Sequence, residues 1–493
     1  MMTFEDFAYE RPDLQVVTER LEELLGEFDQ AKPGDLVGIV RAVKRLRARW
    51  TTQQSLCYVR HTADTSDTFY EAEQAYFDEV APQFDALVHR FHEALAKSEH
   101  VGAVTEAFGP QYMRRVRASL RSFDPSTVAS LGEENRLASS YTKLRAQASI
   151  PFRGQTYNLS SIQPLLIDRD RTTRREANEA VWSFYAEHEA ELQELFAKLV
   201  AQRTDIARRQ GRDNFVSLGY DRMSRTDYGP QEVAAFRAQV REHIVPLATE
   251  LYRRQSERLG QDALEYHDEG LAWPQGNPKP RGNPEATVAA AADLYAELSK
   301  ETEQFFAVME ERGLMDLVAR DNKAPGGYCT YLPSFCVPFI FSNFNGTSGD
   351  IDVLTHELGH AFQMYEASRQ PLLEYLMPTY EACEIPSMSM EFFAYPWMDK
   401  FFADEAERYR TNHLEMAVKY LPYITAIDEF QHLVYEQPDM TSEERLRAWL
   451  DLEAAYLPHR DYGSSASAGI DLLLERFDFS QRPKAQQFKV TPH

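Results

Sequence analysis

Apolar residues recur with the 3.6-residue period of an α-helix along most of this chain. One such stripe follows Asp13, a residue that suits a helix N-cap, and it consists of Val17, Leu21, Leu24, Leu25 and Phe28. Two further stripes lie at 192–199 and 294–309, and the helices that contain them should end near Gly211 and Gly313. Similar patterns run through 70–97, 174–190, 232–260 and 402–435. The chain is therefore predicted to be mainly α-helical, with helices that pack through one apolar face.

The segment 324–350 breaks this helical rhythm. It is rich in proline, glycine, β-branched and aromatic residues, which favours a short strand around 339–343. Pro338 stands at the start of this strand, and because proline cannot donate to a sheet ladder, we expect an edge strand. The segment 268–286, rich in Gly, Pro and Asn, is expected to be a surface loop. The predicted fold is mainly α with a small β-sheet.

Charge and length exclude several classes of protein. The chain has 493 residues and a formal net charge of −24, which repels phosphate backbones and anionic lipid, so we expect neither nucleic acid nor a membrane as a partner. The longest strongly apolar stretch, 335–341, is too short to span a bilayer, and the first residues do not resemble a signal peptide. The four cysteines do not form a disulfide framework. We expect a soluble, cytoplasmic protein with reduced thiols.

The string His-Glu-Leu-Gly-His at 356–360 is the strongest sign of chemistry in the chain. On a helix, His356 and His360 lie one turn apart on the same face, where both imidazoles can reach one zinc ion. Glu357 then lies about 100° round the helix and can take a proton from a metal-bound water. An apolar stripe beside the histidines supports a helix here. The sequence therefore predicts two metal ligands and a general base.

A hydrolytic zinc site needs a third protein ligand and one open position. No third histidine follows within ten residues, so we expect a carboxylate from the segment 379–393. Glu381, Glu384 and Glu391 fall on one helical face that otherwise reads as core, where a charged group must be paired or bound to a metal. Their spacing alone does not choose among them. Pro386 predicts that the helix begins, or kinks, just after Glu384.

The strings His-Glu-Leu-Gly-His-Ala-Phe-Gln and Glu-Ile-Pro-Ser-Met-Ser-Met-Glu together resemble the thimet oligopeptidase / oligoendopeptidase F family of zinc metallopeptidases. The bacterial oligoendopeptidase F branch is most similar, and the stretches Ala-Pro-Gly-Gly-Tyr, Phe-Ser-Asn-Phe-Asn-Gly and Tyr-Leu-Pro-His-Arg-Asp-Tyr-Gly extend the resemblance over residues 10–463. It implies that Glu384 is the third ligand and that each chain binds one Zn²⁺. It further implies a two-lobed helical fold with a deep channel, which has the zinc at its floor and admits short peptides only.

From this resemblance we expect an N-terminal helical lobe over 1–185, a zinc peptidase region over 186–463 and a divergent tail over 464–493. The expected function is endopeptidase cleavage of short oligopeptides. In this reaction Glu357 deprotonates the attacking water and then passes the proton to the leaving amine.

Further residues are predicted to support the site. Asp352 lies one turn before His356 and could accept the ring N–H of a metal-bound histidine; Glu391 and Glu381 are candidates for a similar role. The alternative for Asp352 is an ordinary acid at a helix N-terminus. Tyr328, which follows two glycines, is predicted to border the cleft and bind substrate. The strand before the zinc helix is expected either to bind a peptide as an added strand or to be an ordinary hairpin.

The tail departs from the pattern of the resembled family, whose members continue into a helical segment with a His and several Tyr that stabilise the oxyanion. Here residues 464–493 contain no tyrosine, and their only histidine is His493. Because each lost oxyanion donor typically costs about 10²–10³ in rate, one alternative is a weakened or inactive zinc-containing peptide-binding protein. The other is a helical scaffold without metal. Candidate substitute donors are Tyr420, Tyr423, Tyr435, Tyr456 and Tyr462.

Overall fold

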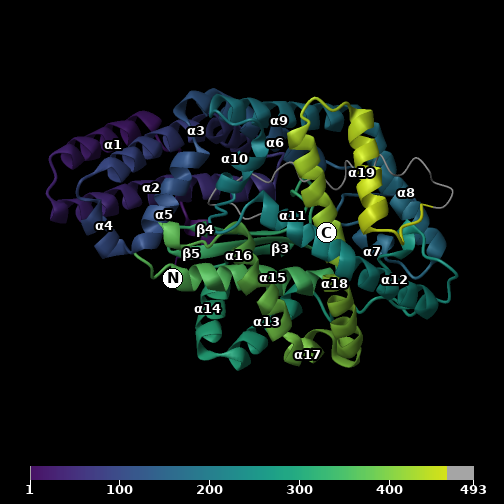
Figure 1. The fold of residues 1–493 in the computed structure, drawn as a ribbon. Helices are drawn as coiled ribbons and strands as arrows, with labels where there is room; N and C mark the ends of the chain where they lie inside the picture. Colours follow the sequence, from purple (N-terminus) through teal and green to yellow (C-terminus); the bar gives the residue numbers. More distant parts are fainter. Residues whose placement is uncertain (1, 463–493) are drawn as a thin grey trace.

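The computed structural model describes residues 2–462, and this part of the chain is mainly α-helical, as predicted (Figure 1). α1 (Leu14–Asp29) begins after Asp13, whose side chain accepts hydrogen bonds from the backbone N–H groups of Gln15 and Val16, so the predicted N-cap is confirmed. The helices that follow before the first strand are α2 (Pro33–Ala63), α3 (Thr68–Lys97), α4 (Val101–Phe108), α5 (Pro110–Ser122) and α6 (Val128–Ala146).

A two-stranded hairpin, β1 (Ile150–Phe152) and β2 (Gln155–Tyr157), separates these helices from the next set. That set consists of α7 (Gln163–Leu166), α8 (Arg171–Glu187), α9 (Glu189–Arg209), α10 (Phe215–Arg222), α11 (Pro230–Gln239), α12 (Val245–Leu259), α13 (Pro284–Leu298) and α14 (Lys300–Glu311). α9 and α14 end just before Gly211 and Gly313, which both have a positive φ, as predicted. The predicted stripe 294–309 is divided between α13 and α14, because Ser299 is extended and its side chain caps α14.

The second sheet has three strands, β3 (Met315–Val318), β4 (Tyr328–Leu332) and β5 (Val337–Phe344), in the order β3-β5-β4. β5 pairs in parallel with β3 and antiparallel with β4. The predicted strand at 339–343 is therefore confirmed as the middle of β5.

Pro338 lies in the central strand of this sheet, so the prediction of an edge strand is wrong. The N–H of Ile340 donates to the carbonyl oxygen of Leu314 at 2.9 Å, and alternate backbone N–H positions of a strand face the same neighbour. The nitrogen of Pro338 therefore faces the β3 side, where β3 starts only at Met315, opposite Ile340. Proline is tolerated in this central strand because its missing N–H points past the end of the neighbouring strand.

α15 (Gly349–Ala367) follows β5 and lies along the three-stranded sheet (Figure 1). Leu354, Leu358 and Ala361 on one of its faces are fully buried in an apolar core that also contains side chains of β4 and β5. The sheet and α15 thus pack as one unit. This packing fixes the rotation of α15 about its own axis, and so the direction in which its opposite face points. The remaining α-helices of residues 2–462 are α16 (Tyr380–Phe393), α17 (Met398–Phe402), α18 (Ala406–Glu436) and α19 (Ser442–Tyr456).

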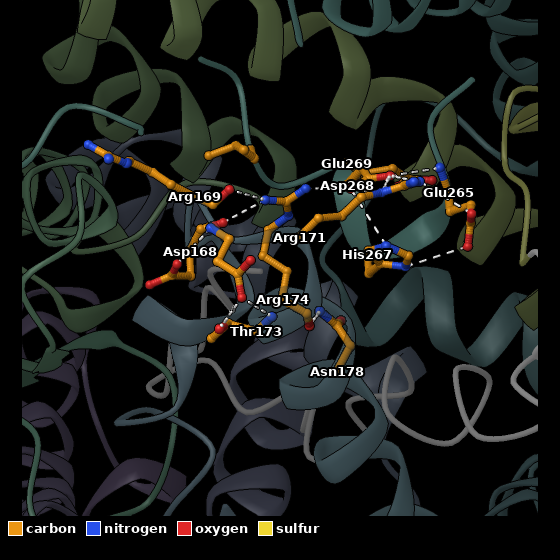
Figure 2. A network of polar contacts seen from close by, with 12 residues as sticks. Asp168, Arg169, Arg171, Thr173, Arg174, Asn178, Glu265, His267, Asp268 and Glu269 are labelled. Carbon is orange, nitrogen blue, oxygen red and sulfur yellow. Dashed lines mark hydrogen bonds and ion pairs between the residues drawn. The ribbon is translucent and has the colours of Figure 1, made fainter. Parts of the chain in front are cut away.

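An ion-pair network around the buried carboxylate of Asp268 joins α8 to the segment that precedes α13 (Figure 2). Arg171 and Arg174 both contact Asp268, with nitrogen–oxygen distances of 2.6 Å and 2.5 Å. Beside them, Arg460 pairs with Glu269 at 2.7 Å. Because buried charges are tolerated only when they are paired, this network holds the segment after α19 against elements from earlier in the chain. None of the helices in residues 2–462 has the length and apolar character that crossing a bilayer requires.

Candidate metal centre

His356, Glu357 and His360 all lie on α15, as the sequence predicts. The chain enters this helix through a tight turn at Gly346, whose φ of 85° favours glycine. The carboxylate of Asp350, in the first turn of α15, accepts the N–H groups of Asn345 and Gly346 at 2.9 Å and 2.8 Å. This contact fixes the helix start, and with it the height of both histidines along the helix.

Glu384 lies on α16, which runs from Tyr380 to Phe393 without a break. Of the two predicted alternatives, a helix that begins just after Glu384 is therefore wrong, and a kink at that point stays a prediction. Pro386 lies inside the helix, where it removes one N–H donor without ending the helix. Starting the helix at Tyr380 places Glu384 in its second turn, facing α15.

The structure brings His356, His360 and Glu384 together from these two helices. Oε2 of Glu384 lies 3.1 Å from Nε2 of His356 and 3.4 Å from Nε2 of His360. One potential ligand atom from each residue lies within 4.8 Å of the other two. Two imidazoles and one carboxylate are a ligand set typical of catalytic zinc, which leaves a fourth position open.

The two helices approach closely at Gly359, in the middle of the His-Glu-Leu-Gly-His string. A Cβ atom at this position would lie 2.7 Å from the carbonyl oxygen of Pro386 and 2.9 Å from Cβ of Met390. Any residue other than glycine would therefore push α16 away from α15. The glycine allows the helix separation at which Glu384 reaches both histidines.

Two neighbouring side chains hold the carboxylate of Glu384. The hydroxyl of Ser387 donates to Oε2 at 2.9 Å, and the thiol of Cys383 donates to Oε1 at 3.4 Å. Burial opposes ionisation of Glu384, but His356 and His360 hold the pKa of its carboxyl below the ordinary value. In turn, although burial acts against it, Glu384 and Glu391 raise the pKa of His356 to about 10. The site is therefore strongly polarised and suited to a cation.

Glu357 is fully buried beside these residues. Neither of its carboxylate oxygens has a hydrogen-bond partner among the described residues, and burial raises its pKa to about 8. Gly327 lies against it, because a Cβ on that glycine would be 3.6 Å from Oε1 of Glu357. A buried carboxyl without a partner, beside a potential cation site, can exchange a proton near neutral pH.

Glu391, and not Asp352, lies at the second ring nitrogen of His356. Its Oε1 is 2.6 Å from Nδ1 of His356, and its Oε2 is 2.6 Å from Nε2 of His413. Asp352 instead accepts a hydrogen bond from the hydroxyl of Tyr409. Glu381 points elsewhere and pairs with Arg225.

His413 is a residue that the sequence analysis missed. It lies on α18, more than 50 positions after the histidine pair, and has no ligand spacing to another histidine. The signal that could have found it is its position one helical turn after Tyr409, on the same face of the helix.

Tyr328 is part of β4 and not of a loop at the cleft. Its side chain is buried, its ring stacks on Phe341 at 4.7 Å, and its hydroxyl is 2.7 Å from the hydroxyl of Thr62. This position does not fit the predicted contact with substrate, because the polar end of the side chain is already hydrogen-bonded inside the core. Of the two alternatives for the strand before the zinc helix, an added peptide strand on β5 is excluded because β5 has a neighbour on both sides, and the ordinary hairpin is found as its antiparallel pairing with β4.

Three of the tyrosines considered as substitute oxyanion donors already have partners. The hydroxyl of Tyr435 accepts from Arg203, and the hydroxyls of Tyr456 and Tyr462 donate to carboxylates. For Tyr420 on α18, burial raises the pKa of the hydroxyl, and Tyr423 and the charge of Glu384 add to this effect, so this tyrosine lies within electrostatic reach of the site. The expected divergent tail, 464–493, lies outside the described residues.

Two family models match the chain. The model of the peptidase M3 N-terminal domain matches residues 4–123, and the model of peptidase family M3 matches residues 165–468. A search of curated proteins found no match.

Solved structures that are similar over nearly the whole chain include the following three. One, described provisionally as an oligoendopeptidase F, is 46% identical, with 97% of this chain and 86% of that chain covered and a TM-score of 0.96. PZ peptidase A with an inhibitor is 44% identical, with 97% and 85% covered and a TM-score of 0.95. A protein of Bacillus anthracis strain Ames, also described provisionally as an oligoendopeptidase F, is 44% identical, with 96% and 86% covered and a TM-score of 0.92.

Proposed function

Because this chain belongs to peptidase family M3 and is a zinc metallopeptidase of the oligoendopeptidase F type, we propose that it hydrolyses internal peptide bonds of short oligopeptides. We further propose that each chain holds one Zn²⁺ between His356, His360 and Glu384. The proposal rests on one geometric observation: a carboxylate oxygen from α16 lies 3.1 Å and 3.4 Å from two imidazole nitrogens of α15.

When bound, the zinc ion would supply a Lewis acid that lowers the pKa of water and polarises a carbonyl group. Glu357 is the residue of this chain that moves the proton. Its carboxylate accepts a proton from the water as the new carbon–oxygen bond forms at the peptide carbonyl. It then donates that proton to the amide nitrogen as the carbon–nitrogen bond breaks, so that an amine leaves. Burial of Glu357 supports this role because it places the proton affinity of the carboxylate near neutral pH.

We propose that the substrate is an extended short peptide. β4 is an edge strand of the sheet, and Gly327, directly before it, lies against Glu357. A peptide paired with the outer edge of β4 would be held through its backbone, which gives little preference for side chains. The deep channel implied by the family resemblance would in addition exclude folded proteins, so that only short peptides reach the site.

Glu357→Gln tests the proposed mechanism. The amide keeps the shape of the side chain but cannot act as a base, so hydrolysis of a quenched short peptide should fall by about 10²–10⁴-fold. Zinc content, measured on the same preparation, should remain at one ion per chain. The matched control is Glu366→Gln, further along α15, where the carboxylate pairs with Arg369 and hydrolysis should be unchanged. Unchanged hydrolysis in Glu357→Gln would contradict the proposal.

A second candidate is a zinc-containing protein that binds peptides but turns them over weakly or not at all. The observation that favours it is that residues 464–493 contain no tyrosine and so supply no tyrosine hydroxyl to an oxyanion. Calorimetry distinguishes the two. The second candidate would be supported if the zinc-loaded wild type binds peptides but shows no chelator-sensitive hydrolysis of them.

A further inference from the structure

α18 provides none of the three proposed ligands, yet it contacts both helices that do. Tyr409 and His413 are one helical turn apart and therefore lie on the same face of α18. The hydroxyl of Tyr409 donates to Asp352 on α15, and Nε2 of His413 lies 2.6 Å from Glu391 on α16. Each ligand helix is thus joined to α18 through one carboxylate.

Both contacts are inside the protein and are constrained from several sides. Only 2% of Tyr409 is exposed, and 7% of the His413 side chain. The second nitrogen of His413 lies 2.8 Å from the hydroxyl of Tyr395, so both of its ring nitrogens have partners. The Tyr409 ring stacks on Phe402, with centroids 4.2 Å apart. Neither side chain can turn away without leaving a buried polar atom unpaired.

The carboxylate of Glu391 lies between two imidazoles. One of its oxygens contacts Nδ1 of His356, and the other contacts Nε2 of His413. A carboxylate only accepts hydrogen bonds, so both of these nitrogens donate. In the neutral ring that a metal requires, a proton on Nδ1 of His356 leaves the lone pair on Nε2, the nitrogen that faces Glu384. The orientation of Glu391 therefore decides which nitrogen of His356 is available to a metal.

We propose that His413 and Tyr409 are positioning residues of the metal centre. His413 orients Glu391, which in turn fixes the tautomer and orientation of His356. Tyr409 anchors Asp352 and thereby holds α15 in position one helical turn before His356. This inference rests on the proposed zinc site. It adds α18 to the elements on which metal affinity depends.

The test measures zinc affinity of the full chain by competition with a fluorescent chelator. His413→Leu removes the donor, Glu391→Gln removes the charged acceptor, and the double variant removes both. His413→Gln keeps an N–H donor near the place of Nε2. The control is His432→Leu, which replaces another buried histidine of α18 whose partner is the hydroxyl of Tyr220, 3.1 Å away.

We expect His413→Leu and Glu391→Gln each to weaken zinc binding by about 10–100-fold, the range typical of residues that hold a metal ligand. The double variant should bind no more weakly than Glu391→Gln alone, because His413 acts through Glu391. His413→Gln should recover most of the loss, and His432→Leu should bind as the wild type does. If His413→Leu does not fold, Tyr409→Phe, which removes one hydroxyl and keeps the ring, should still weaken zinc binding measurably.

Three results overturn this inference but not the proposed metal centre. The first is wild-type zinc affinity in both His413→Leu and Tyr409→Phe. The second is a double variant in which the two losses of zinc affinity multiply, and the third is a His413→Gln variant that binds zinc no better than His413→Leu. A wild-type chain that takes up no zinc would overturn the proposed metal centre together with this inference. The two failures are therefore distinguishable in one set of titrations.

Discussion

Gly359 on α15 and Ser387 on α16 lie so close that a Cβ atom on the glycine would stand 2.6 Å from Cα of the serine. Real Cβ atoms do not approach backbone atoms this closely, and backbone cannot give way as a flexible side chain can. The separation of the two helices, and with it the distance from Glu384 to both histidines, therefore depends on the absence of one side chain.

Gly359→Ala should separate the helices and weaken both the fold and the metal site. We expect overpacking to lower the free energy of unfolding by at least about 1–3 kcal/mol, and zinc affinity to fall because Glu384 moves away from the histidines. Thermal unfolding with and without zinc measures both effects. Gly38→Ala is the control, since a Cβ at that position in α2 meets nothing within 4 Å, and the same change there should be neutral or stabilise by up to about 1 kcal/mol. Equal behaviour of the two variants would contradict the prediction.

Ser387→Ala should weaken zinc binding without unfolding the protein. The hydroxyl donates to Oε2 of Glu384, the oxygen that faces both imidazoles, and a hydrogen bond of this kind contributes about 0.5–1.5 kcal/mol. We therefore expect zinc affinity to drop by about 2–10-fold in chelator competition. Ser389→Ala, at a position about 140° round the helix from Glu384, is the matched control and should bind zinc as the wild type does. A Ser387→Ala variant with wild-type affinity would show that Glu384 does not need this support.

The histidine pair and Glu357 could be predicted from the sequence because their geometry is set within one helix. Glu384 could not be chosen by spacing, since three glutamates fell on one helical face. The family resemblance singles out Glu384, and the structure brings it within reach of both histidines.

The partners of these residues could not be predicted, because they depend on how separate helices cross. Whether Asp352 or Glu391 meets His356 is decided by the contact between α15 and α16, and His413 arrives from α18. Pro338 shows the same limit in the sheet: the rule about edge strands is sound, but the short length of β3 made a central position acceptable.

Tyr328→Phe should lower stability and leave catalysis unchanged. The hydroxyl of Tyr328 is hydrogen-bonded to Thr62 inside the core, so its loss should cost about 1 kcal/mol of unfolding free energy. KM and kcat for a short peptide should remain those of the wild type. Thr62→Ala, which removes the partner, should show a similar loss of stability. A raised KM in Tyr328→Phe at unchanged stability would instead support the predicted contact with substrate.

Glu134 on α6 is a buried carboxylate that accepts hydrogen bonds from Arg203 of α9 at 2.8 Å and from Arg222 of α10 at 2.9 Å. Burial alone would raise its pKa, but the two guanidinium groups lower it to about 2. A folded-state pKa below the unfolded value means that ionised Glu134 stabilises the folded state. This contribution is complete above the ordinary glutamate pKa of about 4.3 and is lost as the pH falls through about 2.

Glu134→Gln should therefore remove part of the acid sensitivity of the fold. At pH 7 the variant leaves two buried arginines without a counter-charge, so we expect it to lose about 3–5 kcal/mol of unfolding free energy. Between pH 5 and pH 3 the wild type should lose stability more steeply than the variant, since only the wild type takes up a proton at this position on unfolding. Urea unfolding at pH 7, 5 and 3 measures both effects. Glu133→Gln is the control: its exposed carboxylate pairs with Arg136 on the same helix, and its stability should follow the wild type at every pH. Parallel stability curves for Glu134→Gln and the wild type would contradict the lowered pKa.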